Sequence, residues 1–290
     1  MADMDTTNAA AAAATPATEQ EDLSKQQGAK ITVHWLNKSR AQRIIWLLEE
    51  LHLTYTILPY KRDPSTKRAG PDLRAVHPLG KSPVISILPA GEKEELVIAE
   101  SEMIVEYLCE HFGGKEGEGE GAGKGLIPKR WKEGCEGKVG GETEEWLRWK
   151  FLMTYTEGSL FTPLIVSLIT TTLRSFPLPF FLKPLTATVA SKIDSSFVDP
   201  ELTTHFTFLE SYLKESPGEF FCGERFTGAD IMLHFGLEAA CQRVPLSEGS
   251  YPGLYAYMRR LQGRGAYRRA AGRVEGVSGE VFVPFSDAKL

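Results

Sequence analysis

The stretch His77-Pro78-Leu79-Gly80-Lys81-Ser82-Pro83-Val84 stands directly before a predicted β-hairpin, and the pair Glu100-Ser101 follows that hairpin. The hairpin strands are expected over residues 84–88 and 96–99, because apolar β-rich segments flank a Pro-Ala-Gly turn. A Ser-Pro step that enters a strand is a suitable place for a cis peptide bond. Such a bond turns the N–H and C=O of Ser82 outward, where a ligand with an extended peptide backbone could pair with them.

Glu100 and Ser101 begin a run whose apolar residues recur at helical spacing. The N-terminus of a helix carries free N–H groups that can receive a carboxylate. The two features together predict one site for a small peptide that has both an amino end and a carboxylate end.

The residues before this stretch complete an α+β pattern. We expect a strand over 31–36, a helix over 40–52, a second strand over 54–60 and a short helix over 72–76. With the hairpin and the helix after Glu100, the order is βαβ-α-ββα. This order is that of a thioredoxin-like domain.

The rest of the chain is predicted to be all-helical after a linker. Helices are expected over 142–176, with a bend or break near Pro163, and over 180–196, 200–215, 228–243 and 251–271. Thr227 and Asp230 form a capping-box variant in which Thr227 caps the helix and Asp230 reaches back. The predicted divisions are a disordered tail (1–28), a thioredoxin-like domain (29–115), a Gly/Glu-rich linker insertion (116–141), an all-helical domain (142–274) and a C-terminal tail (275–290).

The motif His77–Pro83 and the pair Glu100-Ser101 resemble the glutathione-binding half of cytosolic glutathione S-transferases, in order and in spacing. The segment from Ser39 to Leu51 is similar to the Ser-Arg-x-x-Arg-Ile-x-Trp-Leu-Leu-Glu-Glu-Leu pattern of the fungal and bacterial branch of that superfamily. The resemblance spans most of residues 30–272. It implies a thioredoxin-like glutathione-binding domain followed by a helical domain.

The resemblance also implies roles for the motif residues. Lys81 would meet the glycine carboxylate of glutathione, and Ser82 with Pro83 would present backbone to the cysteinyl unit. Glu100 would take the γ-glutamyl ammonium group, assisted by the Ser101 hydroxyl.

Thiol activation needs a donor near a helix N-terminus, because the thiolate is the nucleophile and a free thiol is little ionised at neutral pH. Ser39 is the first candidate and Asn37 the second. Ser39 could equally be a plain N-cap of the helix. The position at which serine-type transferases usually carry the catalytic serine is occupied here by Leu36.

The electrophile pocket is expected between the two domains, with Tyr155, Glu157 and Phe161 as candidate wall residues. Aromatic residues on a long helix also commonly belong to the core, so both interpretations stand for them.

The composition restricts the classes of function. The net charge is −5, so no overall field attracts nucleic acid. The four cysteines include no C-x-x-C pair and the histidines no ligand spacing, which favours a reducing compartment and no metal site. We expect a cytoplasmic protein without a signal peptide. The terminal Ala288-Lys289-Leu290 is similar to a peroxisomal address of the Ser-Lys-Leu type.

Two further stretches have more than one interpretation. Residues 160–173 are apolar but too short for a bilayer span, which leaves peripheral membrane contact open. Arginines gather near the end of the chain, which is expected to be a solvated face that balances acids elsewhere rather than a nucleic-acid site. They are Arg259, Arg260, Arg264, Arg268, Arg269 and Arg273.

The resemblance implies a homodimeric enzyme that conjugates the glutathione thiolate to electrophilic small molecules, in detoxification and stress response. Reduction of organic hydroperoxides by the same thiolate is an implied side reaction. Two alternatives remain open at this point: a glutathione-binding sensor or scaffold that does not catalyse, and a glutathione-dependent thiol-disulfide reductase.

Overall fold

Four strands form a mixed sheet in the order β2-β1-β3-β4. Their bounds in the computed structural model are β1 Lys30–Leu36, β2 Tyr55–Tyr60, β3 Val84–Leu88 and β4 Leu96–Ala99. Strands β1 and β2 are parallel because helix α1 (Ala41–Glu50) crosses between them, whereas β3 and β4 are antiparallel to their neighbours. The structure describes residues 23–113, 125–177, 179–241 and 246–282.

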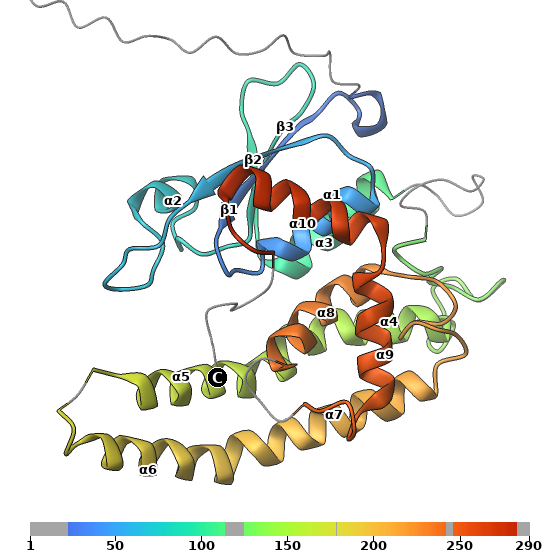
Figure 1. Ribbon diagram of the computed structural model, residues 1–290. Helices are drawn as coiled ribbons and strands as arrows, with labels where there is room; N and C mark the ends of the chain where they lie inside the picture. Colours follow the sequence, from blue (N-terminus) through green and yellow to red (C-terminus); the bar gives the residue numbers. More distant parts are fainter. Residues whose placement is uncertain (1–22, 114–124, 178, 242–245, 283–290) are drawn as a thin grey trace, which may run out of the picture.

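Helices α2 (Pro71–Val76) and α3 (Ser101–Phe112) complete the thioredoxin-like domain, so the predicted α+β fold class is confirmed. Helix α1 is almost entirely buried, because it lies between the sheet and the helices that follow (Figure 1). It starts one residue later and ends two residues earlier than the sequence predicted.

The second domain is all-helical, as expected. Its helices are α4 Glu144–Tyr155, α5 Phe161–Ser175, α6 Lys183–Ile193, α7 Asp199–Lys214, α8 Gly228–Cys241, α9 Pro252–Gln262 and α10 Gly265–Ser278. A π-helical turn, Thr156–Leu160, joins α4 to α5 just before Pro163. The widened turn locally loosens the hydrogen-bond ladder near a residue that cannot donate to it. The predicted irregularity near Pro163 is therefore present as a π turn within a continuous helix.

Two predicted helix boundaries are wrong. The segments 180–196 and 200–215 are one continuous helix, because a second π-helical turn, Asp194–Val198, accommodates Pro200 in the same way. The single helix expected over 251–271 is instead two, α9 and α10. It is interrupted at Gly263 and Arg264, where Arg264 takes an extended backbone conformation.

Helix α10 packs on α1 of the first domain rather than within the helical domain (Figure 1). Arg264 pairs with Glu50, and Arg269 and Arg273 pair with Glu49. Arg259 and Arg260 pair with Glu248 and Glu219. The predicted balance by acids elsewhere is therefore confirmed for five of the six arginines, and the acids that pair with Arg264, Arg269 and Arg273 belong to α1.

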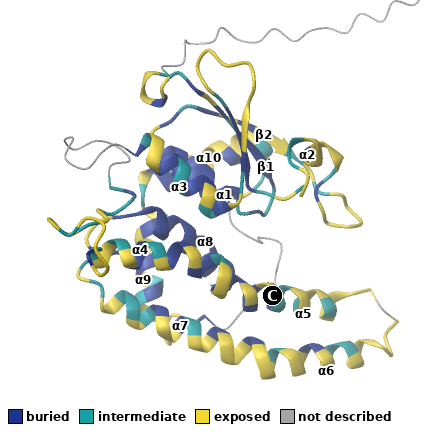
Figure 2. Ribbon diagram, turned by 180° about the vertical axis from the view of Figure 1, so that it is seen from behind, coloured by how far each residue is buried: buried dark blue, intermediate teal, exposed yellow. Residues whose placement is uncertain are grey.

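Helix α8 is the buried centre of the helical domain (Figure 2). At its start the Asp230 carboxylate accepts from the Thr227 N–H at 2.7 Å and from the Thr227 hydroxyl at 2.9 Å, so Asp230 does reach back. The Tyr257 hydroxyl donates to the other carboxylate oxygen at 2.6 Å. The Thr227 hydroxyl thus donates to Asp230, and the Asp230 half of the predicted capping box is present.

The described part of the predicted linker lies against the helical domain. Leu126 is buried and its carbonyl accepts from the Gly228 N–H at 2.9 Å, while Trp131 and Glu142 form a short β-bridge. The remainder of the linker (116–124), the last two residues of the predicted first domain (114–115), most of the predicted N-terminal tail (1–22) and Ala288-Lys289-Leu290 lie outside the described residues.

The helix from Glu144 to Ser175 has the length and the apolar composition of a membrane-crossing helix. Half of its most apolar window is buried inside the protein, as in the core helix of a folded domain.

Candidate functional site

Two clefts meet at the boundary between the domains and share a wall made of Ser39, Arg40, Arg62 and Ser82. The first, called here the apolar cleft, has a volume of about 180 Å³. Its other walls are Lys38, Phe161, Leu164, Ile165, Leu168, Phe235 and Ala239. The second, the cationic cleft, has a volume of about 520 Å³, and its other walls are Leu36, Lys67, Arg68, Ala69, Arg74, Leu79, Gly80 and Lys81.

The sheet register brings the two halves of the predicted site together. Val84 pairs with Ala99, so the Ser82-Pro83 step and the Glu100-Ser101 pair are neighbours at the same end of adjacent strands. The Ser82-Pro83 peptide is cis, as expected. Gly80 has φ +56°, a left-handed conformation that favours glycine, and this explains why the motif carries glycine there.

Ser39 lies at the junction of the two clefts, just before α1. Its Oγ is 3.0 Å from the Ser82 Oγ and accepts from the Ala41 N–H at 3.2 Å. Arg40, rather than Ser39, is the N-cap residue of α1. The Ser39 hydroxyl is therefore held by two hydrogen bonds, and Ser39 is one of the residues that line both clefts.

Asn37, the second candidate activator, does not line either cleft among the described residues. Its carbonyl accepts from the Arg62 Nε and Nη2 at 3.1 and 3.0 Å. Its side-chain Oδ1 is buried without a hydrogen-bond partner in the described structure. Asn37 thus positions Arg62 through its backbone.

Ser101 is buried and belongs to a polar network that crosses the domain boundary. Its Oγ accepts from the Arg43 Nη1 at 3.1 Å, and the same nitrogen pairs with the Glu157 carboxylate. Arg43 is 1% exposed, and burial lowers its pKa to about 10 against the opposing pull of Glu157. Its Nε and Nη2 have no hydrogen-bond partner in the described structure, and its guanidinium lies 5.1 Å from the centroids of the Phe161 and Phe235 rings.

Glu157 is held as a carboxylate by this network. Burial alone would raise its pKa, but the charges of Arg43 and Arg40 and the Arg43 hydrogen bond together hold the pKa below its ordinary value. Arg40 Nε lies 3.3 Å from the second carboxylate oxygen. Glu157 therefore lies behind the wall of the apolar cleft and not among its lining residues.

Of the three predicted pocket residues, the structure brings only Phe161 into the lining of the apolar cleft. Tyr155 lies elsewhere in the helical domain, where its hydroxyl is 2.7 Å from the His205 Nδ1 and burial raises the Tyr155 pKa. Phe235 on α8 and Leu164 and Leu168 on α5 are lining residues that the sequence analysis missed. Their helical spacing could have pointed to one face, but not to what that face meets.

Glu100 is exposed and has φ +74°, which is uncommon for a residue with a side chain and is a feature of ligand sites. Lys81 lines the cationic cleft beside Arg68 and Arg74. No acidic side chain is among the described residues that line this cleft, so the cleft is suited to an anion.

The described structure places no cysteine in the lining of either cleft. Cys109 and Cys222 are buried, and burial raises the pKa of both thiols. Within residues 23–113, 125–177, 179–241 and 246–282 there is also no group of three or more His, Cys, Asp or Glu side chains that could hold a metal ion.

Comparisons with known proteins identify the family. The family model for the glutathione S-transferase N-terminal domain matches residues 39–111, and that for the C-terminal domain matches residues 179–265. The chain is 30% identical over 237 residues to glutathione S-transferase 1 of Saccharomyces cerevisiae, covering 82% of this chain and 92% of that one. It is 30% identical over 245 residues to glutathione S-transferase 3 of Schizosaccharomyces pombe, covering 84% and 88% respectively.

Solved structures show the same fold. The glutathione transferase URE2P8 from Phanerochaete chrysosporium, with oxidized glutathione, superposes with a TM-score of 0.60 at 16% identity and covers 90% of this chain and all of that one. The match at 30% identity over most of both yeast chains, together with matching N- and C-terminal domains, establishes the relationship. The chain belongs to the glutathione S-transferase family.

Proposed function

We propose that this chain binds glutathione in the cationic cleft and beside Glu100, and that its thiolate attacks an electrophile held in the apolar cleft. The observation that carries the proposal is the position of the Ser39 hydroxyl on the wall that the two clefts share. A nucleophile held there faces an anion-binding cleft on one side and an apolar cleft on the other.

The hydrogen bonds of Ser39 support its role as thiol activator. The Ala41 N–H donates to Ser39 Oγ, and the Ser82 hydroxyl can donate to the same oxygen. In that arrangement the proton of Ser39 is left to donate to a thiolate, and the start of α1 adds a favourable field for negative charge. Asn37, whose side chain does not line the clefts, remains the second choice.

The binding roles follow from the chemistry of glutathione. Lys81 in the cationic cleft would pair with the glycine carboxylate, and the backbone of Ser82 next to Pro83 would pair with the cysteinyl unit. Glu100 would pair with the γ-glutamyl ammonium group. Ser101, whose hydroxyl already accepts from Arg43, can still donate its own proton to the γ-glutamyl carboxylate.

The reaction forms a carbon–sulfur bond between the thiolate and the electrophilic carbon. A leaving group departs with the bonding electrons, or an activated double bond takes them up and is then protonated. With an organic hydroperoxide the thiolate would instead break the O–O bond to give an alcohol and a sulfenic acid, which a second glutathione converts to the disulfide and water. A role in detoxification and stress response would follow.

The alternative of a thiol-disulfide reductase is less well supported, because serine stands at position 39 and neither cleft is lined by cysteine in the described structure. A sensor or scaffold without catalysis differs from the proposal in one measurable property, the ionisation of bound glutathione. Titration of the thiolate absorbance of the bound glutathione against pH distinguishes the two. A thiol pKa clearly below that of free glutathione supports catalysis, whereas binding without a shift supports the sensor.

A homodimer is proposed on a separate surface. β4 is an edge strand with Leu96 and Val97 exposed, and Met103 on α3 with Leu147 and Phe151 on α4 are also exposed. Lys150 on α4 forms ion pairs with Glu102 and Glu106 on α3. The exposed apolar residues of α3 and α4 therefore lie on neighbouring helices. Phe151→Glu is expected to give a monomer in sedimentation equilibrium. We also propose a cytoplasmic location. Membership of the fungal and bacterial branch is proposed on the Ser39–Leu51 segment, and the two yeast relatives are from fungi.

A further inference from the structure

The tip of the α5–α6 hairpin carries a cluster of exposed apolar side chains that the proposed reaction does not use. They are Phe176, Phe180, Phe181, Leu182 and Leu185, which we call the hairpin tip. Phe180 is 83% exposed and Phe181 65% exposed, and their rings contact each other edge to face at 5.7 Å. The two helices extend away from the rest of the protein, so the tip is a convex projection rather than a groove (Figures 1 and 2).

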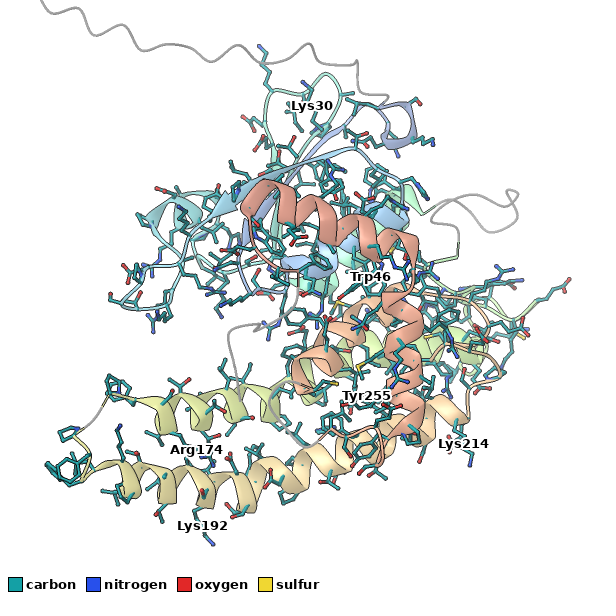
Figure 3. The ribbon with its side chains drawn as sticks, viewed as in Figure 1. Lys30, Trp46, Arg174, Lys192, Lys214 and Tyr255 are labelled. Carbon is teal, nitrogen blue, oxygen red and sulfur yellow. The ribbon has the colours of Figure 1, made fainter. Side chains whose placement is uncertain are left out.

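The charge around the tip differs in sign from that of the whole chain. Residues 158–193 contain three bases and no acid, although the chain has a net charge of −5. The bases are Arg174, Lys183 and Lys192 (the first and last are labelled in Figure 3). Arg174 pairs with Asp194. Lys183, which follows Leu182 of the hairpin tip, and Lys192 are exposed and have no ion pair in the described structure.

We propose that the hairpin tip docks this protein onto the surface of a membrane that contains anionic lipids. Phenylalanine and leucine side chains enter the boundary between headgroups and acyl chains, and flanking lysines pair with anionic headgroups. A convex apolar tip whose flanking charges are all basic fits the surface of an anionic bilayer. Binding in a groove of a partner protein would require neither a projecting tip nor flanking charges of one sign. Since α5 also supplies Leu164, Ile165 and Leu168 to the apolar cleft, docking holds that cleft close to the bilayer.

The test uses the full chain with vesicles of phosphatidylcholine, alone or mixed with phosphatidylserine. Wild type is expected to cosediment with the mixed vesicles, more weakly as salt rises. The Phe180→Ser/Phe181→Ser variant is expected to bind them about tenfold more weakly, and Lys183→Glu/Lys192→Glu to lose the preference for anionic vesicles. The matched control Val139→Ser/Val277→Ser removes exposed apolar residues outside the hairpin and is expected to bind as wild type.

A second measurement does not depend on the folding of the serine variant. In Phe180→Trp the new indole is expected to shift its emission to the blue on mixing with anionic vesicles and to be quenched by brominated lipid. Absence of binding by wild type, equal loss in the control variant, or an unshifted indole emission in Phe180→Trp would overturn the proposal. It would equally be overturned if Phe180→Ser/Phe181→Ser split a dimer in sedimentation equilibrium, since the tip would then contact a second copy. Glutathione binding is expected to be unchanged throughout, so the inference stands apart from the proposed reaction.

Discussion

The hydroxyl oxygens of Ser39 and Ser82 lie 3.0 Å apart, and the Ala41 N–H donates to the Ser39 oxygen from the other side at 3.2 Å. Ser39 can therefore direct its own proton at a thiolate. We predict that Ser39→Ala lowers turnover tenfold or more, about 1.4 kcal/mol in the barrier, and raises the pKa of the bound thiol. Steady-state kinetics with a chromogenic electrophile and the thiolate titration measure the two effects.

Two matched variants give this prediction its control. Asn37→Ala is expected to leave turnover within about twofold, because its side chain does not line the clefts. Ser82→Ala removes one donor to Ser39 Oγ and is expected to cost about threefold, less than loss of Ser39 itself. If Ser39→Ala kept full turnover while Asn37→Ala lost it, the assignment of the activator would pass to Asn37.

The pair between Arg43 and Glu157 joins α1 to the π turn of the helical domain. Because Arg43 is buried, removal of its partner leaves an uncompensated charge in the interior. We predict that Glu157→Ala lowers the free energy of unfolding by about 3 kcal/mol, and that Arg43→Met added to it restores much of the loss. Urea unfolding followed by tryptophan fluorescence measures both.

The surface pair of Glu106 with Lys150 is the matched control for this prediction, since Lys150 is 42% exposed. Glu106→Ala is expected to cost less than about 1 kcal/mol. Equal losses in Glu106→Ala and Glu157→Ala, or no recovery in the double variant, would show that burial of Arg43 does not determine the cost.

Lys81 lies in a cleft whose described lining holds several bases and no acid. We predict that Lys81→Ala weakens glutathione binding about fivefold, about 1 kcal/mol, with a smaller loss at high salt. Isothermal titration calorimetry measures the dissociation constant. Lys93→Ala, an exposed lysine of the β-hairpin turn that does not line the cleft, is the control. If Lys93→Ala weakened glutathione binding by the same factor, the effect of Lys81→Ala would be explained by the change in net charge alone.

Much of the fold could be predicted from local pattern. The strands alternate or form apolar runs, α1 has its apolar residues at helical spacing, and the Ser82-Pro83 step before β3 is cis as expected. Helix boundaries were harder to predict, because Pro163 and Pro200 look like helix ends in the sequence. In the structure, π turns ahead of both prolines let the helices continue.

The site was predictable where its residues are close in sequence and not where distant segments meet. Arg43 looks like one more surface arginine, yet the packing of α1 against Phe161 and Phe235 buries it. Glu157 looks like a pocket residue on the long helix, but it turns to Arg43 and Arg40. The ion pair between Glu49 and Arg269 joins residues far apart in the chain, and no local pattern in a single sequence predicts it.

His234 on α8 is 1% exposed and packs edge-on against the rings of Trp46 and Tyr267, at a centroid distance of 5.2 Å from each. Burial, reinforced by the Arg43 charge, lowers its pKa to about 3. It is therefore neutral at neutral pH, and its approach of 3.8 Å to Glu238 is a contact rather than an ion pair.

This shifted pKa makes folding sensitive to acid in a defined window. The folded-state pKa lies below the unfolded value of 6.5, so the unfolded chain gains a proton first as pH falls, and stability is lost from about pH 6.5 down toward pH 3. We predict that His234→Gln removes about 2 kcal/mol of the loss in unfolding free energy between pH 7 and pH 5. Urea unfolding at the two pH values measures the difference. The control, His111→Gln, changes an exposed histidine on α3 and is expected to keep the wild-type dependence. Equal pH dependence in wild type and His234→Gln would mean that His234 takes up its proton in the folded state, paired with Glu238.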